Sequence, residues 1–473
     1  MSLGVKLSEV LTFTRGQWLG KSTSNLVFTG VSTDSRSIEP GELFVALKGQ
    51  NFDGADYIDQ AIQNGAKGVI TDRSGVSAPS LILVNNSLKA LGDLARYVRR
   101  RLGLRVLAIT GSVGKTTVKE MAKNILKAKN RLMDPIRKDP VRDILATEGN
   151  LNNEIGLPLT ILSLIKMELP PVEAVLEMGA AKPGDISYLA SIARPEVGLI
   201  TAIGQAHLEG FRDLATVAKT KAELFRSLGG DGLAVANKSE TCLREELKDS
   251  LAKIMYFGPG GQVWLKKIQA TDLFKQKLTF GGASVADMEV EIAWPGEHNA
   301  INALAATAAS LAMGCGQMEI KEGLAKTPNM PGRLNPLKSP KGFWVLDDSY
   351  NANPTSVRAS LKLLDELPVK GQKAVILGDM LELGPDSPSF HQEIGALVAS
   401  LGLDFLMVVG SEANRVINGV LSVNQGRLAA LSFDNPIEAA DWLLERGENL
   451  EAILVKGSRA VKLERAVARL MEA

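Results

Sequence analysis

The 473-residue sequence has little cysteine, almost no net charge and no long apolar segment. Its two cysteines, Cys242 and Cys315, are too few for a disulfide framework or a cysteine-based metal site, and they suit a reducing cytoplasm. A net charge of +1 provides no general attraction to nucleic acid or to an anionic membrane. We therefore expect neither as a partner, and any polyanion must be held by a local site.

The absence of a long apolar segment bears on localisation. The most apolar stretch, residues 303–313, is far shorter than the ~20 residues that span a bilayer, and the N-terminus lacks the apolar core of a secretion signal. We expect a soluble, unprocessed, cytoplasmic protein. The chain is nevertheless 45% apolar, and its length exceeds what one hydrophobic core serves, which predicts about three domains.

Short β-type runs alternate with helical patterns along the chain. Such alternation is typical of parallel, doubly wound sheets, so we predict an α/β protein. The expected domains are residues 1–86, 87–329 and 330–473, with the last junction at the proline-rich segment 327–332. The expected strands are residues 43–47, 68–70 and 81–84 in the first domain, 106–109, 172–176, 197–203 and 232–236 in the second, and 343–346, 374–377, 405–409 and 452–455 in the third.

The most informative motif is the run Thr-Gly-Ser-Val-Gly-Lys-Thr-Thr at residues 110–117, between an apolar strand and a helical pattern. Backbone N–H groups of such a turn point at a phosphate, Lys115 supplies a positive charge, and the Thr116 hydroxyl can bind Mg²⁺. The longer Walker pattern needs a glycine at the position of Ile109, so an ordinary glycine turn is the alternative. We predict a nucleoside triphosphate site that includes Gly111, Ser112, Val113, Gly114, Lys115, Thr116 and Thr117.

Three further residues of the second domain could carry chemistry. Glu177 ends an apolar strand beside a glycine and could hold Mg²⁺ near the phosphate loop, although a solvated acid is the alternative. Lys221 shares the apolar face of a helix expected over residues 216–228, where the alternative is a lysine whose head reaches water. His207 follows a strand end and could bind metal or phosphate, although most isolated histidines do neither.

Polar loops supply candidates for a substrate. Residues 147–156 concentrate amides that offer donors and acceptors together, and residues 347–354 follow a strand end with a similar density of polar groups. His298 and Asn299 open an alanine-rich helix with Asn302 one turn later, which suits a base or a phosphate as well as simple N-capping. Residues 32–36 offer hydroxyls and a guanidinium to a second phosphate-bearing ligand, although a surface turn could look the same.

Together these segments resemble the Mur ligase family, and the resemblance covers nearly the whole chain. The double-asparagine loop, the Asp-Ser-Tyr-Asn-Ala-Asn-Pro run and the Leu-Gly-Asp-Met run are most similar to members that join D-alanyl-D-alanine to UDP-N-acetylmuramoyl-tripeptide. The segments that carry the resemblance are residues 110–117, 149–156, 177–179, 207–209, 296–299, 332–333, 347–354, 377–384 and 456–459.

The resemblance implies a bacterial cytoplasmic enzyme of peptidoglycan precursor synthesis, and we expect a monomer. Its N-terminal domain would grip the UDP part of the substrate, its central domain would bind ATP, and its C-terminal domain would be Rossmann-like. The implied reaction transfers the γ-phosphoryl group of ATP to the terminal carboxylate of the tripeptide, and the amine of D-alanyl-D-alanine attacks the acyl phosphate. Domain closure is expected, because acyl phosphates hydrolyse in water.

The resemblance also implies roles for individual residues. The catalytic group would be Lys115, Lys221, His207 and Glu177. Two Mg²⁺ ions would be held, the first by Thr116 and Glu177 and the second by His207 and a carbamylated Lys221. The nucleotide would lie against His298, Asn299, Asn302 and Arg333, with Asp348 at the ribose. The substrates would lie against Ser32, Thr33, Asp34, Ser35, Arg36, Lys48, Gly49, Asn150, Asn152, Asn153, Tyr350, Asn351 and Asn353.

One segment departs from the family, and three other functions stay open. The charged, proline-broken stretch at residues 131–140 looks longer than the family usually has there, which suggests a surface insertion or a role in substrate closure. The open alternatives are a ligase of the same architecture that adds one amino acid, a phosphate-loop kinase or NTPase, and a nucleotide-sugar-binding scaffold without turnover. The missing glycine at position 109 favours an amide ligase over a general NTPase.

Overall fold

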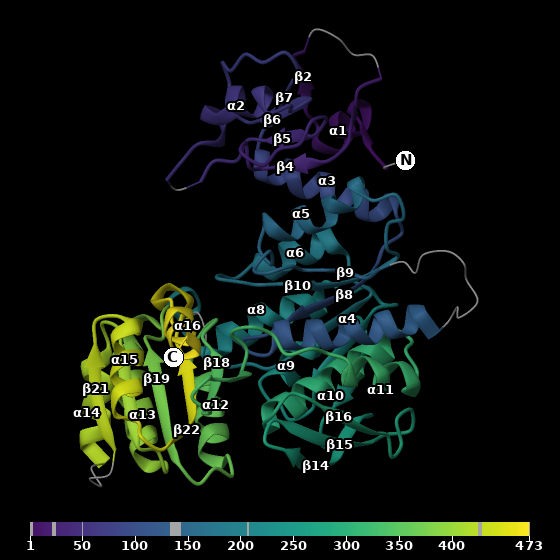
Figure 1. Cartoon of the computed structure of the whole chain (residues 1–473). Helices are drawn as coiled ribbons and strands as arrows, with labels where there is room; N and C mark the ends of the chain where they lie inside the picture. The colour runs from purple at the N-terminus through teal and green to yellow at the C-terminus, as the bar shows by residue number, and fades with distance from the viewer. Residues whose placement is uncertain are drawn as a thin grey trace.

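The structure is a computed structural model that describes residues 3–20, 25–49, 51–132, 143–205, 208–423 and 428–472. Three regions, each built on its own sheet, follow one another along the chain, with the N-terminal region at the top of the view and the other two side by side below it (Figure 1). The predicted α/β fold with three domains is confirmed. Most of the expected insertion at residues 131–140 lies outside the described residues.

The N-terminal domain is built on a small, largely parallel sheet. Its strand order is β2-β7-β6-β5-β4, and only β2 runs antiparallel to its neighbour. The bounds are β2 (Gln17–Trp18), β4 (Val31–Ser32), β5 (Leu43–Val45), β6 (Gly68–Thr71) and β7 (Leu81–Leu83), with α1 (Leu7–Thr14), α2 (Ile58–Gln63) and the antiparallel pair β1 (Val5–Lys6) and β3 (Val27–Phe28).

Helix α3 (Ser87–Arg101) lies between the N-terminal and middle domains (Figure 1). The Asn86 side chain caps it by accepting from the Lys89 N–H, and its apolar face shares one continuous core with residues of both domains. An ion pair crosses the same junction, because Lys166 Nζ of the middle domain lies 2.7 Å from Oε1 of the buried Glu42. The N-terminal domain is therefore packed against the middle domain.

The middle domain contains a six-stranded, fully parallel sheet in the order β13-β12-β11-β8-β10-β9. Alternate residues of the central strand β8 belong to two different hydrophobic cores, since helices cover both faces. The strands are β8 (Arg105–Thr110), β9 (Leu145–Ala146), β10 (Glu173–Glu177), β11 (Val197–Ile200), β12 (Leu233–Asn237) and β13 (Lys253–Phe257). The helices are α4 (Lys115–Leu132), α5 (Gly156–Leu162), α6 (Asp185–Ala193), α7 (Leu208–Phe211), α8 (Leu214–Arg226), α9 (Leu243–Leu247), α10 (Glu297–Ala312) and α11 (Gln317–Ala325).

The middle domain also carries an antiparallel sheet that the sequence analysis did not predict. It consists of β14 (Trp264–Asp272), β15 (Lys275–Gly281) and β16 (Glu289–Ile292). At the tip of its first hairpin, Phe274 packs edge-on against Trp344 of the C-terminal domain, with ring centroids 4.7 Å apart. The buried Gln276 side chain donates to the Trp294 and Gly296 carbonyls at 2.6 and 2.9 Å, which fixes the chain just before α10.

The C-terminal domain has a second six-stranded sheet, in the order β17-β18-β22-β19-β20-β21, with only β17 antiparallel. The strands are β17 (Asn335–Lys338), β18 (Trp344–Asp348), β19 (Gln372–Gly378), β20 (Phe405–Val409), β21 (Ala429–Phe433) and β22 (Leu450–Lys456). The helices are α12 (Pro354–Glu366), α13 (Ser387–Ser400), α14 (Ala413–Val423), α15 (Pro436–Arg446) and α16 (Glu464–Glu472).

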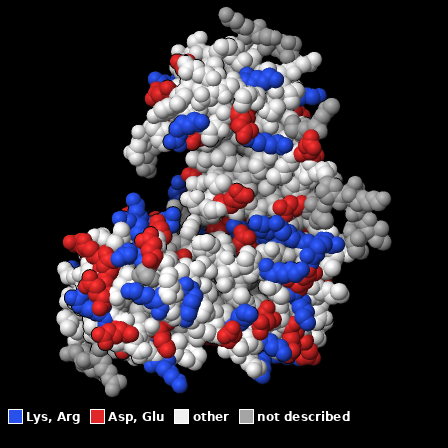
Figure 2. All heavy atoms as spheres, viewed as in Figure 1, with Lys and Arg blue, Asp and Glu red and all other residues white. Residues whose placement is uncertain are grey.

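The distribution of charge on the surface agrees with the near-zero net charge of the sequence. Basic and acidic side chains are interspersed on the face shown in Figure 2. No helix within the described residues has both the length and the apolar character that crossing a membrane requires.

Two glycines let α13 and α14 cross closely. A Cβ on Gly395 would lie 1.9 Å from the Val416 carbonyl oxygen, and one on Gly419 would lie 2.0 Å from the Gln392 carbonyl oxygen. This crossing matters for the site because α13 carries His391, whose Nε2 accepts from the Met380 N–H at 2.9 Å in a loop beside the cavity described below.

We predict that Gly395→Ala lowers the free energy of unfolding of the C-terminal domain by about 1–3 kcal/mol, because the helices must separate to admit the methyl group. Urea denaturation followed by circular dichroism measures the change. Gly402→Ala in the same domain is the control, since a Cβ there meets only Asp365 Oδ1, at an ordinary contact distance of 3.4 Å. Equal stability of the two variants would contradict the close crossing.

Candidate functional site

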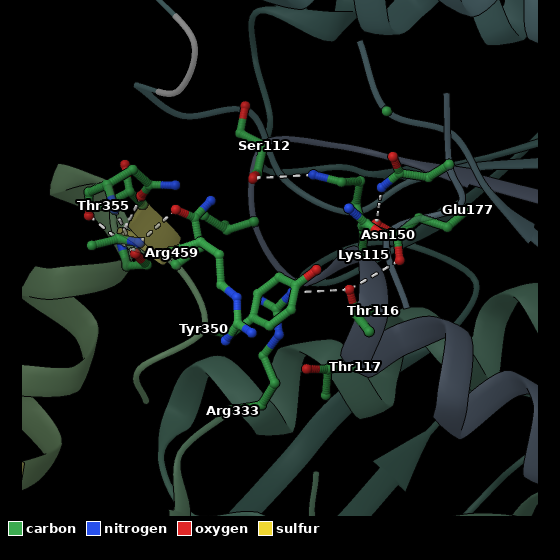
Figure 3. A pocket seen from close by; sticks show the side chains of 18 of the residues that line it. Ser112, Lys115, Thr116, Thr117, Asn150, Glu177, Arg333, Tyr350, Thr355 and Arg459 are labelled. Carbon is green, nitrogen blue, oxygen red and sulfur yellow. Dashed lines mark hydrogen bonds between the residues drawn. The ribbon is translucent and has the colours of Figure 1, made fainter. Parts of the chain in front are cut away.

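A cavity of about 890 Å³ lies between the middle and C-terminal domains. The phosphate loop, α6 and α10 form its middle-domain side, and the loops after β18, β19 and β22 form the C-terminal side. Figure 3 shows side chains of both domains pointing into the same space. The predicted site residues that line the cavity are Ser112, Val113, Gly114, Lys115, Thr116, Thr117, Asn150, Asn152, Asn153, Glu177, Lys221, His298, Asn299, Asn302, Arg333, Asp348, Tyr350, Asn351 and Asn353.

The phosphate loop has the predicted strand, turn and helix geometry. Strand β8 ends at Thr110 and α4 begins at Lys115, with Gly111 at φ +147° and Gly114 at φ +83°. Both angles fall where a side chain is strained, and a Cβ on Gly114 would lie 2.4 Å from Oδ1 of Asn302. The free N–H groups at the start of α4 make this turn an anion site.

Lys115 lies over its own loop. Its Nζ donates to the Gly111 carbonyl at 2.7 Å, and Figure 3 shows it also pointing to Ser112. Burial lowers the pKa of Lys115, the Glu177 carboxylate opposes that shift, and the Arg333 guanidinium adds to it. The negative charge of Glu177 stabilises the Lys115 ammonium only in part, and a bound phosphate would stabilise it further.

Glu177 is buried at the end of β10, and two neutral donors hold its carboxylate. Thr116 Oγ1 donates to Oε2 at 2.9 Å, and Asn152 Nδ2 donates to Oε1 at 2.9 Å. The Thr116 hydroxyl and the Glu177 carboxylate supply oxygen atoms of the kind that Mg²⁺ prefers. Among the described residues no group of three or more His, Cys, Asp or Glu side chains is arranged to hold a metal ion.

Lys221 is buried on α8, as its position on the apolar face predicted. The helix starts at the Asp213 cap, and Lys221 is 2% exposed with Nζ 5.5 Å from the centroid of the Phe211 ring. Burial, and secondly the charge of Lys115, lower the pKa of Lys221 to about 7. A large share of this amine is therefore neutral and nucleophilic near pH 7.

The start of α10 presents a polar face to the cavity. Asn302 Nδ2 donates to Asn299 Oδ1 at 3.1 Å, and Asn299 Nδ2 donates to the Pro295 carbonyl at 2.9 Å. Burial lowers the pKa of His298 to about 4, and the nearby Asp348 carboxylate only partly opposes the shift. His298 is therefore neutral at pH 7 and can donate and accept hydrogen bonds, as contact with a base requires.

The C-terminal domain reaches across the cavity through Arg333. Its Nη2 donates to Thr116 Oγ1 at 3.2 Å, although the two residues are 217 positions apart in the sequence. Its guanidinium also lies 4.1 Å from the centroid of the Tyr350 ring, and Arg459 lies 5.8 Å from the same ring. Figure 3 shows both arginines beside Tyr350, so cationic groups of this domain face the phosphate loop.

Some polar side chains in residues 347–354, at and after the end of β18, have structural partners. Asp348 accepts hydrogen bonds from Lys456 Nζ at 2.5 Å and Ser360 Oγ at 2.7 Å, so it is already engaged with its own domain. Asn353 caps α12 by accepting from the Ser356 N–H at 2.8 Å. Both residues also line the cavity, and their contacts with ligand stay predictions.

Comparison with known proteins identifies the family. Profiles described as "Mur ligase family, catalytic domain", "Mur ligase middle domain" and "Mur ligase, glutamate ligase domain" match residues 27–108, 109–310 and 332–459. The UDP-N-acetylmuramoyl-tripeptide--D-alanyl-D-alanine ligase of Escherichia coli (strain K12) is 35% identical over 99% of both chains. The chain belongs to the Mur ligase family.

Solved structures of Mur ligases share the whole architecture. The structure titled "Crystal structure I of MurF from Acinetobacter baumannii" superposes with a TM-score of 0.88 at 32% identity, covering all of both chains. MurF ligase from Thermotoga maritima in complex with ADP superposes with a TM-score of 0.80 at 31% identity, covering 94% of this chain and 97% of that one.

Not every predicted residue of this Mur ligase joins the cavity. Gly111 of the phosphate loop does not line it, and neither do the predicted residues of the N-terminal domain, which are Ser32, Thr33, Asp34, Ser35, Arg36, Lys48 and Gly49. Asp34 is paired with Arg36 at 2.7 Å, and Ser35 Oγ donates to Gln60 at 2.7 Å. His207, predicted as catalytic and as a metal ligand, lies outside the described residues.

Several cavity residues were not among the predicted site residues. Lys456 ends strand β22 and Arg459 follows it, and the Lys-Gly-Ser-Arg run at a predicted strand end was a signal that could have found them. Asp185 and Tyr188 enter from α6, and Glu382 from the loop after β19. Asp185 and Tyr188 lie in an ordinary helical pattern, so only the tertiary structure shows that they face the cavity.

We predict that Gly114→Ala lowers the affinity for ADP by about tenfold or more, equivalent to about 1.4 kcal/mol or more, because the methyl group meets Asn302 and the backbone is strained. Isothermal titration calorimetry measures the affinity. Gly314→Ala is the matched control, because Gly314 has a similar φ of +79° and nothing within 4 Å of the added Cβ. Equal losses in both variants would attribute the effect to general destabilisation of the protein and not to the phosphate loop.

Proposed function

We propose that this Mur ligase uses ATP to join D-alanyl-D-alanine to UDP-N-acetylmuramoyl-tripeptide, forming the pentapeptide precursor with ADP and phosphate. The observation that carries the proposal is the shared cavity, in which the phosphate loop, Glu177 and the buried Lys221 face Arg333 and Tyr350 of the C-terminal domain. The relative of that name in Escherichia coli, 35% identical over 99% of both chains, supports the choice of substrates.

In the proposed reaction the chain's own groups bind and orient the phosphates. The N-terminus of α4 and Lys115 hold the phosphates of ATP. Arg333 approaches from the C-terminal domain, and its positive charge stabilises the negative charge of the transferred phosphoryl group. The tripeptide carboxylate is the acceptor, and it becomes an acyl phosphate. The amine of D-alanyl-D-alanine forms the new C–N bond, and inorganic phosphate leaves as the tetrahedral intermediate collapses.

Mg²⁺ belongs to the proposal as a cofactor. Thr116 and Glu177 would hold one ion together with phosphate oxygens, and a carbamylated Lys221 with His207 would hold a second. When bound, the ions neutralise charge on the transferring phosphoryl group. The lowered pKa of Lys221, about 7, supports carbamylation, because only a neutral amine attacks CO₂.

The two ends of the substrate would occupy different domains. Asn150, Asn152, Asn153, Asn351 and Tyr350 offer amide and hydroxyl groups to the peptide part in the cavity. The UDP part would bind the N-terminal domain near residues 32–36, Lys48 and Gly49, and His298, Asn299, Asn302 and Asp348 would contact the adenosine. We further propose a monomer in the bacterial cytoplasm, without nucleic-acid or membrane partners.

ADP release tests the substrates. With UDP-N-acetylmuramoyl-tripeptide and ATP, we expect ADP release only when D-alanyl-D-alanine is added, because the amine must capture the acyl phosphate. A coupled pyruvate kinase and lactate dehydrogenase assay measures ADP. Stimulation by L- or D-glutamate but not by the dipeptide would indicate a Mur ligase that adds one amino acid. Full ADP release without any amine would indicate an NTPase.

Lys221 tests the proposed carbamate. We expect Lys221→Ala to lower kcat by about 100-fold or more, the scale for loss of a preorganised electrostatic group. Lys219→Ala is the matched control, because Lys219 is exposed two positions away on the same helix. Activity in Lys221→Ala equal to that of the control would contradict the carbamate role.

The extent of Lys221 carbamylation should depend on pH. Because burial places the pKa of Lys221 at about 7, the neutral amine increases as pH rises from 6 to 8. We therefore expect ¹³C-bicarbonate labelling, measured by ¹³C NMR, to increase over that range in the wild type and in Lys219→Ala. Labelling in Lys221→Ala equal to that of the wild type would show that the label lies elsewhere.

A further inference from the structure

Another buried lysine, Lys119, lies on α4 one turn after Lys115 and outside the cavity lining. It is 2% exposed, and its Nζ donates to the Thr147 carbonyl at 2.5 Å and lies 2.9 Å from Oε1 of Glu120. Burying an ammonium costs free energy unless hydrogen bonds and an opposite charge compensate. The proposed reaction gives this lysine no role, so its position behind the phosphate loop needs another explanation.

Thr147 connects Lys119 to Glu177. It follows β9, is 1% exposed, and accepts a hydrogen bond on Oγ1 from the Glu177 N–H at 2.9 Å. The carbonyl of Thr147 therefore bonds the phosphate-loop helix, while its hydroxyl bonds the backbone of the acid. Thr147 is the single residue between the two charged groups.

The loop that begins at Thr147 also holds the carboxylate of Glu177. Asn152 Nδ2 donates to Oε1 at 2.9 Å, and the Asn152 carbonyl accepts from the Gly179 N–H at 2.8 Å. Thr116, three residues before Lys119 and so on the same face of α4, donates to Oε2 at 2.9 Å. Asn152 of the loop therefore positions Oε1 of Glu177, and Thr116 of α4 positions Oε2. Lys119 joins the start of this loop to α4.

We propose that Lys119 is a positioning residue that sets the placement of the Glu177 carboxylate relative to the Thr116 hydroxyl. Its charge-assisted bond to the Thr147 carbonyl holds the loop of residues 147–156 against α4. Loss of that bond lets the loop, and with it Asn152 and Glu177, move away from Thr116. The inference rests on the proposed role of Glu177 as a ligand of the metal that accompanies ATP.

Binding of Mn²⁺ in the presence of ADP tests the inference without turnover. Electron paramagnetic resonance measures free Mn²⁺, and calorimetry with EDTA measures ADP alone. We expect Lys119→Met to weaken Mn²⁺ binding by about tenfold, as is typical for partners that orient a metal ligand, and to leave the metal-free affinity for ADP unchanged. Lys123→Met is the matched control, because Lys123 lies one turn later on α4 and is partly exposed beside Glu120.

Thr147 provides a second test that leaves Lys119 and its contacts intact. We expect Thr147→Val, which removes the acceptor of the Glu177 N–H, to weaken Mn²⁺ binding like Lys119→Met, and Thr147→Ser to restore it. In the double variant Lys119→Met/Thr147→Val, the fold-loss of Mn²⁺ affinity should be smaller than the product of the two single losses. Both substitutions act through one chain of contacts. If Lys119→Met unfolds, Lys119→Gln, which keeps a long polar side chain but removes the charge from the bond to the Thr147 carbonyl, decides by the same Mn²⁺ measurement.

The outcomes separate this inference from the proposed function. Weaker Mn²⁺ binding in Glu177→Gln but wild-type binding in Lys119→Met and Thr147→Val would overturn the role of Lys119 alone. Wild-type binding in Glu177→Gln would overturn the metal role of Glu177, and the role of Lys119 would fall with it. A loss of metal-free ADP affinity in Lys119→Met as large as the loss of Mn²⁺ binding would assign Lys119 to the fold of the phosphate loop instead.

Discussion

The hydrogen bond between Thr116 and Glu177 joins the two strand ends on which the site depends. Strands β8 and β10 run parallel and in register, with Ile109 opposite Glu177, so the turn after one strand and the acid at the end of the other meet at one edge of the sheet. Parallel strands place all their carboxyl ends at the same edge, and ligands of open α/β sheets bind there. The loop of residues 147–156, Lys119 and the start of α10 are all arranged around this meeting point.

The C-terminal domain completes the site from the other side. Arg333 donates to the same Thr116 hydroxyl, and the contact of Phe274 with Trp344 anchors the domain at a second point. The hairpin that carries Phe274 also carries Gln276, which fixes the chain before α10. One antiparallel hairpin therefore connects the domain interface to the polar face that lines the nucleotide cavity.

Burial governs the charges in the cavity. It lowers the pKa of Lys115, of Lys221 to about 7 and of His298 to about 4, so Lys221 carries less than a full positive charge near pH 7. The charge of the nearby Lys115 adds to the effect of burial on Lys221. An anionic ligand would raise the pKa of Lys115 and so act against the effect of burial. Reaction of the Lys221 amine with CO₂ would replace a partly charged amine with an anionic carbamate.

The sequence by itself determined the features that depend on neighbouring residues. Strand, glycine turn and helix start predicted the phosphate loop, the helical period placed Lys221 inward, and apolar runs located most parallel strands. Only the tertiary structure decided which distant groups meet: Arg333 with Thr116 across 217 positions, Lys456 with Asp348 across 108, and Lys119 with Thr147. It also revealed the β14–β16 sheet and left residues 32–36 outside the cavity. Local patterns follow from backbone geometry within a few turns, whereas these contacts depend on strand order and domain packing.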